Sequence, residues 1–473
     1  MTRINTNVPA LTAINDLTRN NIALSETLRR LSSGLKINKA GDDPAGLIIS
    51  ELLRGEIKSL GQAVNNSERA ANVLATAEGA LNEASSLLVT IKSLAVQAAN
   101  KGALTSEEIQ AAQLQVDSAV ASISRIANTT SFGGTHLVNG SLDYVTSGVS
   151  NTNVSDLAIN SVEFGTNKFV PVVIRVSSAA HTAGLAYMSA GLTASQNITL
   201  EVSGINGVET LSFGGSAHNS AIAFAINTVS DSTGVTAALS GANLVLRSAE
   251  PGSDAFVSVK ALAGTFRTVL AESPATVSQR DTGTDAIATI NGSKAVADGN
   301  FIRLNTTALS LDLTLADNFV GATQFAITGG GALFQLGGGV TSSEQINLGI
   351  RSINAGKLGR SDIGYLSDVM TGGRYSLVGG KANEALQIVD QAILQIATTR
   401  GRLGAFEANT VQTNINSLSV AIENATAAES IIRDTDFAAE TSNLTRSQIL
   451  VSAGTSVLST ANSTPQSVLK LLQ

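Results

Sequence analysis

The chain has 473 residues, too many for one hydrophobic core, so at least two domains are expected. Charged residues make up 14% of it and aromatic residues 4%, while 43% is apolar, which favours packing through Ala, Leu, Ile and Val over an aromatic-lined pocket. A net charge of -7 without a basic run argues against nucleic-acid binding, and the lack of cysteine excludes disulfides and thiolate metal sites.

The N-terminal segment begins without an apolar run behind basic residues, so a cleaved secretory signal is not expected. No stretch of the chain reaches the ~18 consecutive apolar residues that a membrane span needs. From Ile14 onward, apolar residues recur in steps of three and four, which predicts a helix with a coiled-coil-like seam. The seam residues are Ile14, Leu17, Leu24, Leu28, Leu31 and Leu35.

Three glycines and a proline in residues 34–46 predict the end of this first helix. Pro44 suits the first turn of a second helix, in which leucines follow at multiples of seven until the Lys-Gly pair at 101–102. Thr105 and Glu108 have the spacing of a capping box, so a third helix is expected to begin there.

In the middle of the chain, apolar residues recur with a different spacing. Residues 131–140 predict a short hairpin that leaves the helical zone. From about 141 to 330, apolar residues alternate with polar ones in short segments separated by Gly, Ser, Thr and Asn, which predicts mainly antiparallel β structure. Two sub-units are expected, at 172–270 with a helix at 221–229, and at 284–328.

Helical periodicity resumes near Lys381, and a seven-residue spacing marks the last segment. The C-terminal seam residues are Phe437, Leu444, Val451 and Leu458. A single amphipathic helix is marginal in water, because most of its stability comes from packing its apolar face. Each end of the chain therefore needs the other end, or a neighbouring subunit, as a partner. A contact between subunits that does not close into a ring generates a helical filament.

Sequence motifs near the two chain ends are specific enough to suggest a family. They are LRRLSSGLKIN at 28–38, DDPAGL at 42–47, LAVQAAN at 94–100, LGAFEANT at 403–410 and RDTDFAAETSNLTRSQIL at 433–450. With these motifs, residues 1–140 and 381–473 resemble the bacterial flagellins. The middle is similar, more weakly, to the β segments inserted in some flagellins.

The resemblance implies an α+β fold: a long antiparallel helical coiled-coil rod formed by the N- and C-terminal regions, with mainly antiparallel β outer domains inserted between them. Seven regions are expected in chain order. They are an N-terminal inner-core helix and spoke (1–44), the N-terminal half of the rod (45–140), a connector (141–171), an outer β domain with one helix (172–282), a second β segment (283–330), a return connector with the C-terminal half of the rod (331–430) and a C-terminal inner-core helix (431–473).

The same resemblance implies a structural subunit rather than an enzyme. Such a subunit is exported unfolded by the flagellar type III system and polymerises with itself into the extracellular filament used for swimming. An export chaperone, the filament cap and the hook-junction proteins are the other implied partners. No cofactor, nucleic acid or membrane partner is expected.

One further expectation concerns host recognition. In many flagellins, the helix surface read by the Toll-like receptor that senses them is similar to residues 88–97 of this chain. The candidate receptor-facing residues are Leu88, Thr90, Leu94 and Gln97. Thr90 stands where those flagellins carry an arginine, and a threonine offers neither the charge nor the forked donors of a guanidinium. Recognition by this receptor is therefore expected to be weak.

Few residues in the sequence are candidates for a metal or catalytic site. His136, His181 and His218 have no second ligand at helical or short-loop spacing, so neither a metal nor a catalytic site is expected. Asp42 and Asp43 are interpreted as carboxylates that complement the dipole at a helix entrance. Three alternatives to a filament subunit remain: a hook-filament junction protein, a helical signalling or scaffold protein, and an enzyme carried in the middle zone.

Overall fold

The computed structural model describes residues 6–100, 102–165, 167–188, 197–361 and 363–471. The chain divides into two compact units. The first contains Met1–Glu68, Leu336–Val340 and Val411–Gln473, and the second contains Arg69–Gln335 and Thr341–Thr410. Within the described ranges, no helix combines the length and the apolar character needed to cross a membrane.

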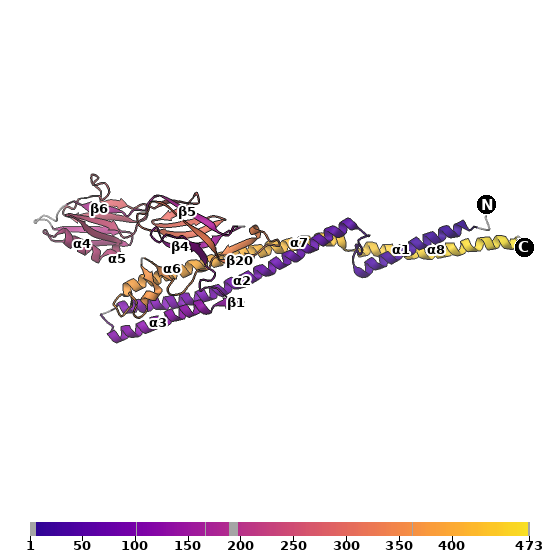
Figure 1. Cartoon of the computed structure of the whole chain (residues 1–473), viewed down its shortest axis with the longest axis horizontal. Helices are drawn as coiled ribbons and strands as arrows, with labels where there is room; N and C mark the ends of the chain where they lie inside the picture. Colours follow the sequence, from indigo (N-terminus) through magenta and orange to yellow (C-terminus); the bar gives the residue numbers. More distant parts are fainter. Residues whose placement is uncertain (1–5, 101, 166, 189–196, 362, 472–473) are drawn as a thin grey trace. The chain divides into compact units, whose positions relative to one another are not determined.

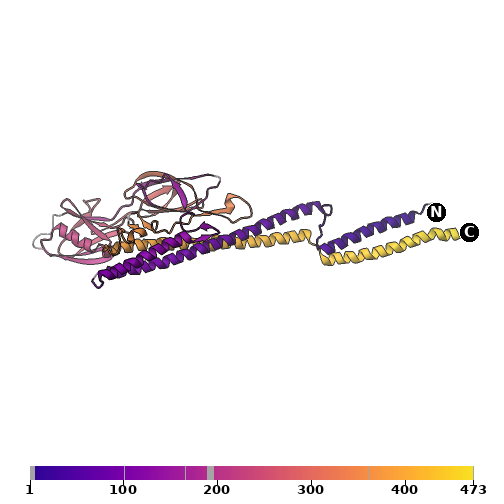
Figure 2. The same cartoon turned by 60° about the horizontal axis from the view of Figure 1, so that its bottom comes forward.

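The two ends of the chain form a helix pair in the first unit (Figures 1 and 2). α1, Val8–Ser33, begins after Asn7, whose side chain accepts a hydrogen bond from the amide of Ala10 at 3.1 Å. α8, Phe437–Leu471, lies beside α1, and the Asn7 side-chain amide donates to the carbonyl of Ala461 at 2.9 Å. Because the start of α1 meets the later part of α8, the two helices are antiparallel.

A short joint follows α1 and precedes α8. Gly34 ends α1 in the left-handed conformation at φ 73°, which glycine adopts without strain. The amide of Lys36 donates to the carbonyl of Arg433 at 2.7 Å, and the amide of Thr435 donates to the carbonyl of Gly34 at 2.9 Å. Arg433 ends α7, Gln412–Arg433, and pairs at 3.1 Å with Glu51 of α2, Pro44–Ala99. The two connecting segments are thus tied to each other.

The helical part of the second unit contains the later turns of α2, together with α3, Ser106–Thr129, and α6, Ala382–Phe406. α3 begins with the predicted capping box: the amide of Glu108 donates to Thr105 Oγ1 at 3.3 Å, and the Glu108 carboxylate accepts from the Thr105 amide at 2.8 Å. The buried apolar face predicted for these helices is present. Its members include Leu74, Leu81, Leu88, Ile91, Val116, Ile123, Val389 and Ile396.

A π-helical turn, Glu407–Val411, joins α6 to α7. The apolar residues Leu403 and Phe406 precede this turn, and Val411 is its last residue. In the structure Leu403 and Val411 are buried, whereas Phe406 is half-buried. The wider π turn holds one more residue than an α turn, so it shifts the apolar stripe around the helix at this point.

The first β domain consists of two antiparallel sheets around one core. The sheet orders are β15-β14-β5-β19-β3 and β16-β17-β18-β4-β21-β20. Strand β18 shows the half-buried alternation directly, because Leu309, Leu311, Leu313 and Leu315 are buried and the residues between them are not. The strands are β3 Tyr144–Ser147, β4 Val154–Val162, β5 Val170–Ser178, β14 Ile287–Ile290, β15 Ser293–Lys294, β16 Val296–Asp298, β17 Phe301–Asn305, β18 Leu309–Leu315, β19 Gly321–Gly330, β20 Ala332–Gln335 and β21 Gln345–Leu348.

The second β domain also has two antiparallel sheets, ordered β12-β6-β10-β9 and β13-β11-β7-β8. Its core includes a stacked pair, Tyr187 and Phe266, with ring centroids 4.0 Å apart. The predicted helix is present as α4, Asn219–Thr228. The other elements are β6 Gly184–Tyr187, β7 Ile198–Gly204, β8 Gly207–Phe213, α5 Ser230–Thr233, β9 Val235–Ser240, β10 Asn243–Ser248, β11 Phe256–Ala263, β12 Thr268–Leu270 and β13 Arg280–Thr282.

Short elements complete the second unit. The predicted hairpin is present as β1, Ser131–Phe132, paired with β2, Thr135–His136. The return segment contains the 3-10 turns η1, Ser342–Glu344, and η2, Leu366–Val369, and the strand pair β22, Gly359–Arg360, and β23, Gly364–Tyr365.

The middle of the chain is divided differently from the predicted regions. The boundary expected at 172 falls inside β5, and the segment 141–171, expected as a connector, supplies β3 and β4 to the first β domain. The return segment adds β20 and β21 to the same domain. The physical reason is that the second β domain is inserted between β5 and β14, so the strands that share the first core are far apart in the sequence.

Candidate assembly surface

The inner face of the α1–α8 pair is built mainly from small and medium-sized side chains. On α1, Ala10, Ala13 and Thr27 are buried. Six of the predicted seam residues are half-buried at the same spacing along the two helices. They are Leu17, Leu24 and Leu31 on α1, and Leu444, Val451 and Leu458 on α8.

Gly454 of α8 allows a close approach to α1. A Cβ atom added at this glycine would lie 3.3 Å from Leu17 Cδ1 and 3.8 Å from Leu17 Cβ. The first of these distances is tighter than ordinary van der Waals contact, so Leu17 would have to shift. Glycine at this position therefore lets the helices approach closely without moving the end of the Leu17 side chain.

The remaining predicted seam residues lie elsewhere. Ile14 is 46% exposed, Leu28 is 48% exposed and Phe437 is 56% exposed, so these three are not part of the inner face. Leu35 is half-buried in the joint, where it forms an antiparallel bridge with Asp434. The predicted seam contains the large residues Ile14 and Leu28. In the structure their smaller neighbours Ala13 and Thr27 are the buried residues, which lets the helices approach.

Besides the half-buried leucines and Val451 of the inner face, the outer faces of α1 and α8 carry large apolar side chains that the described part of the chain leaves largely exposed. An ordinary amphipathic helix pair confines such residues to its inner face, whereas here they also lie on the outer faces. The residues are Val8 (58% exposed), Leu11 (55%), Ile22 (62%), Ile449 (62%), Leu450 (44%) and Val457 (58%).

Each of the two helices also lines a shallow groove at its outer face. The groove on α8 has two of the exposed apolar residues, Ile449 and Leu450, beside Arg446, Thr445 and Ser442. The groove on α1 has Ile22 at one side and charged residues at the other. It is lined by Thr18, Asn21, Ile22, Ser25, Glu26, Arg29, Lys39 and Asp42.

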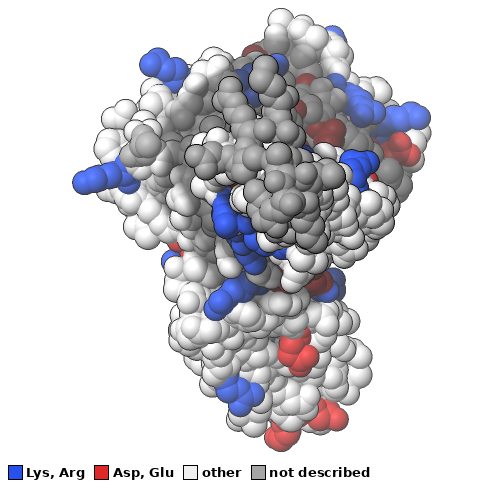
Figure 3. Space-filling model, turned by 90° about the vertical axis from the view of Figure 1, so that its right-hand side faces the viewer, with Lys and Arg blue, Asp and Glu red and all other residues white. Residues whose placement is uncertain are grey.

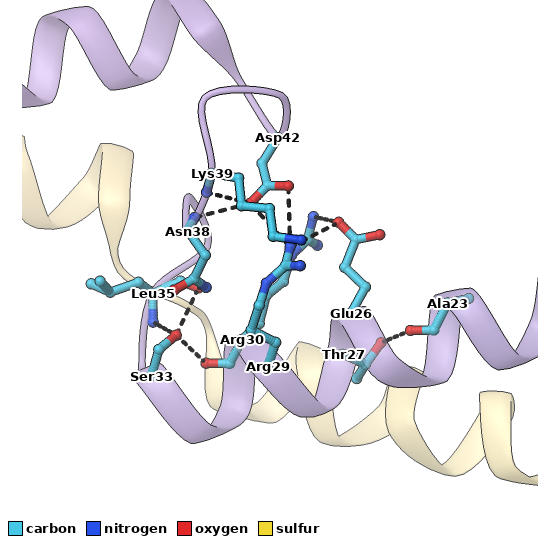
Figure 4. A network of polar contacts seen from close by, with 10 residues as sticks. All are labelled: Ala23, Glu26, Thr27, Arg29, Arg30, Ser33, Leu35, Asn38, Lys39 and Asp42. Atoms are coloured by element: carbon cyan, nitrogen blue, oxygen red, sulfur yellow. Dashed lines mark hydrogen bonds and ion pairs between the residues drawn. The ribbon is translucent and has the colours of Figure 1, made fainter.

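A polar network holds the loop after α1 against the last turns of that helix (Figure 4). Asp42 Oδ2 accepts hydrogen bonds from the amides of Asn38 at 3.0 Å and Lys39 at 2.9 Å. Asp42 Oδ1 also accepts from Arg29 Nη2 at 3.1 Å. These amide donors, and then Arg29, lower the pKa of the Asp42 carboxyl group, although desolvation opposes the shift.

The neighbouring carboxylate has a different role. Asp43 caps α2, because its Oδ1 accepts a hydrogen bond from the amide of Gly46 at 2.9 Å. The prediction of a helix-entrance carboxylate is therefore confirmed for Asp43 and wrong for Asp42, which binds the loop instead. Gly46 is required here by space, since an added Cβ would lie 2.5 Å from Asp43 and 2.8 Å from Ile37.

Charged side chains of both signs are scattered over the surface seen in Figure 3. Figure 3 views the molecule from the side of the chain termini. Among the coloured and white atoms, Lys and Arg side chains are interspersed with Asp and Glu side chains, and uncharged surface separates them. Such a surface favours contacts made through apolar and polar groups over recognition of one large charged partner.

The candidate receptor-facing residues separate into two groups. Leu88 is 0% exposed and Leu94 is 8% exposed, so both belong to the helical core of the second unit and do not face a receptor in this chain. Thr90 and Gln97 are exposed on α2. Lys92, the nearest positive charge along the helix, lies 2.6 Å from Asp390, which offsets its charge.

The three histidines form no metal or catalytic cluster. His181 Nδ1 lies 3.7 Å from a carboxylate oxygen of Glu272, with both side chains largely exposed. Throughout the described part of the chain, no three His, Cys, Asp or Glu side chains are grouped as metal ligands. The surface of α1 and α8 is thus the feature that best distinguishes this molecule.

Comparison with known proteins agrees with this reading. Residues 4–143 match the bacterial flagellin N-terminal helical region, and residues 386–472 match the bacterial flagellin C-terminal helical region. Flagellin B from Helicobacter pylori is 30% identical over 532 residues, covering 100% of this chain and 99% of its own. The flagellin of Salmonella typhimurium is 30% identical over 503 residues, covering 99% of both chains.

Among solved structures, FliC from Burkholderia pseudomallei has 14% sequence identity and a TM-score of 0.26, with 73% of this chain and 99% of that chain covered. The family assignment rests on the sequence comparisons. Relatives matched from end to end are flagellins, which disfavours the junction-protein alternative. The chain therefore belongs to the bacterial flagellin family and is a structural subunit of the extracellular flagellar filament.

Proposed function

We propose that the chain polymerises with copies of itself through the outer faces of α1 and α8. The observation that carries this proposal is the set of six large apolar side chains there, 44% to 62% exposed. Covering one such side chain contributes roughly 1.5 to 3 kcal/mol when the burial is complete. A contact that repeats from subunit to subunit gains this contribution at every interface.

The inner face of the pair supports the same proposal. On α1 the buried members are the small residues Ala10, Ala13 and Thr27, and the six larger seam residues of the two helices are only half-buried, so the contact between α1 and α8 leaves part of the apolar area in water. Most helix stability comes from packing the apolar face. The helix pair is therefore expected to reach full stability only when neighbouring subunits cover its outer faces.

Within the proposed filament, the predicted regions take distinct roles. Residues 1–44 and 431–473 form the inner core, and residues 45–140 form the N-terminal half of the helical rod. The region 331–430 first returns through β20 and β21 of the first β domain and then supplies the C-terminal half of the rod with α6 and α7. The β domains form the outer part and carry no enzymatic activity. The subunit is exported unfolded by the flagellar type III system, with an export chaperone, the filament cap and the hook-junction proteins as its other partners.

Electron microscopy of purified protein induced to polymerise tests the proposal. Ile22→Glu and Ile449→Glu each place a charge in the proposed interface, and each is expected to abolish filaments because a buried unpaired charge is costly. Val208→Glu is the matched control. Val208 has a similar exposure, 57%, but lies on β8, so this variant should form normal filaments. Normal filaments from both isoleucine variants would contradict the proposed surface.

A further inference from the structure

Two chain segments connect the two β domains. Residues 178–183 leave the first domain after β5, and residues 282–286 return to it ahead of β14. The amide of His181 donates to the carbonyl of Thr284 at 2.9 Å, and the amide of Thr284 donates to the carbonyl of His181 at 3.0 Å. Domains joined in this way ordinarily move relative to each other unless their interface restrains them.

Three glycines pack closely around these crossing segments. A Cβ atom at Gly252 would lie 3.1 Å from the amide nitrogen of Gly299, which is tighter than ordinary van der Waals contact. A Cβ atom at Gly283 would lie 2.5 Å from the carbonyl oxygens of Gly252 and His181. At Gly299, in the turn between β16 and β17 of the first domain, an added Cβ would lie 2.4 Å from the carbonyl oxygen of Pro251 in the second domain. The backbone of one domain thus rests directly on the backbone of the other.

One carboxylate binds the backbone of both domains at the same place. Asp285 Oδ1 accepts hydrogen bonds from the amide of Ser253, in the second domain, and from the amide of Gly299, in the first, both at 2.8 Å. Asp285 Oδ2 accepts from the Ser253 hydroxyl at 2.7 Å. Hydrogen bonds to an ionised acceptor are stronger than neutral ones, so this side chain holds the loop at 251–253 against the turn at Gly299.

We propose that this joint, made of the His181–Thr284 bridge, the glycines 252, 283 and 299 and the Asp285 carboxylate, locks the two β domains into one rigid arm. The domains then reorient together instead of independently. Close backbone packing opposes rotation in one direction, because it would drive the 251–253 loop into the Gly299 turn, and rotation in the other direction would break the Asp285 hydrogen bonds to Ser253 and Gly299. The inference does not depend on the proposed polymerisation.

Distance measurement between two spin labels tests the rigid arm. The chain has no cysteine, so the two introduced by Val320→Cys and Phe224→Cys would be the only labelling sites. Val320 is 58% exposed in the first domain, and Phe224 is 76% exposed on α4 of the second. In the full-length monomer, pulsed dipolar spectroscopy should give one narrow distance distribution.

Gly299→Ala, made in the labelled protein, inserts a methyl group into the joint and should widen the distribution at least about twofold. Gly292→Ala is the matched control. Both glycines have positive φ, +58° and +83°, and both lie in turns of the first domain, but nothing lies within 4 Å of a Cβ at Gly292. The control variant should keep the narrow distribution, so the comparison separates packing at the joint from backbone strain in a turn.

Several outcomes would overturn the inference. They are a broad distribution in the protein without joint substitutions, a narrow one in Gly299→Ala, or equal widening in Gly299→Ala and Gly292→Ala. If Gly299→Ala loses its β structure by circular dichroism, Asp285→Ala replaces it, because this variant removes the carboxylate without adding bulk. A folded Asp285→Ala protein with the narrow distribution would equally contradict the rigid joint.

Discussion

The terminal helix pair and the β domains both expose some apolar side chains, such as Phe224 of α4 at 76%, but they differ in how completely they bury the others. In β18, Leu311 and Leu313 are completely or almost completely buried inside one chain. In α1 and α8, Ile22 and Ile449 point outward at 62% exposure each, while Ala13 and Thr27 face inward. The β domains thus have buried apolar cores of their own, whereas the helix pair leaves large apolar side chains on its outer faces, where we propose that a second copy of the chain packs.

The difference follows from how each element meets its partner. A strand that alternates leucine with polar residues buries every leucine once two sheets pack face to face. In the helix pair, small residues such as Ala10 and Gly454 lie at the close contacts. They share the inner face with leucines that are only half-buried, and further large apolar residues lie on the outer faces.

Deleting residues 437–473 is expected to have the largest effect on filament formation. The deletion removes α8, so it exposes the inner face of α1 and removes half of the proposed interface. Filaments should be absent by electron microscopy, while the circular dichroism signal of the β domains should persist because their cores contain no residue from α8. Filaments of normal appearance from the truncated chain would show that the helix pair is not required.

Hydrogen exchange in the monomer compares the local stability of the helix pair with that of the β domains. Local opening costs little where few apolar contacts are buried, so amides in the middle of α1 and α8 should exchange at least ~100-fold faster than those of β5 and β18. Assembly should slow exchange in α1 and α8 and leave the β strands unchanged, since only the helices gain a cover. Equal protection of helices and strands in the monomer would refute the proposed marginal stability of the pair.

Local elements of this fold were predictable from the sequence. The segments NLVLRS and LSLDLTL coincide with β10, Asn243–Ser248, and β18, because alternation and flanking turn residues are local signals. The pairing of β4 with β18 was not predictable, since more than a hundred residues separate them. The predicted regions were therefore contiguous, whereas the first β core is not.

The structural roles of two glutamines, Gln113 and Gln395, were not predictable from the sequence. Gln113 of α3 is 1% exposed, and its side-chain amide donates to the carbonyl of Val369 at 2.9 Å and accepts from the amide of Leu377 at 2.7 Å. Gln395 of α6 similarly binds both the amide and the carbonyl of Gly359. A glutamine on a helix is usually a solvated residue, so nothing local marks these two as anchors of the return segment.

The candidate surface was half predictable for a related reason. Six of the residues chosen by heptad spacing are half-buried, whereas Ile14 and Leu28 are exposed beside the buried Ala13 and Thr27. The role of the six as an assembly seam stays a prediction. Periodicity defines a stripe to within one residue on a helix, and the partner helix decides which edge of the stripe faces inward. That choice depends on the contact with α8, which no local pattern of α1 contains.

Thr90→Arg tests whether an exposed residue of α2 limits host recognition. The substitution supplies the guanidinium expected at this position, and a charge-assisted hydrogen bond contributes about 1.5 to 3 kcal/mol, so potency should rise at least about tenfold. A cell reporter for the flagellin-sensing Toll-like receptor measures the effect. Ser93→Arg, which adds the same charge at another exposed position of α2, is the control. Indistinguishable curves for the native chain and Thr90→Arg would rule out Thr90 as the limiting contact.

The loss of stability in acid tests the contribution of Asp42 in the loop after α1. The pKa of Asp42 is lower in the folded chain than in the unfolded chain, so its contribution to stability is present above the unfolded value, about 4, and is lost as the pH falls through the folded value. Thermal unfolding of the terminal helices, followed by circular dichroism, should shift to lower temperature over that range. Asp42→Asn should remove part of this acid dependence. Asp16→Asn, at an exposed position of α1, should keep it, and equal behaviour of the two variants would contradict the assignment.

The most direct test of the central claim is the reactivity of one thiol in two states of the protein. Ile449→Cys places a cysteine on the outer face of α8, and Val208→Cys places one on β8 at similar exposure, in a chain that has no other cysteine. Both should react rapidly with a maleimide in the monomer. In polymerised protein, Ile449→Cys should react at least about tenfold more slowly because a neighbouring subunit covers it, while Val208→Cys should be unchanged. Equal reactivity of Ile449→Cys in monomer and filament would contradict the claim that polymerisation buries the outer face of the helix pair.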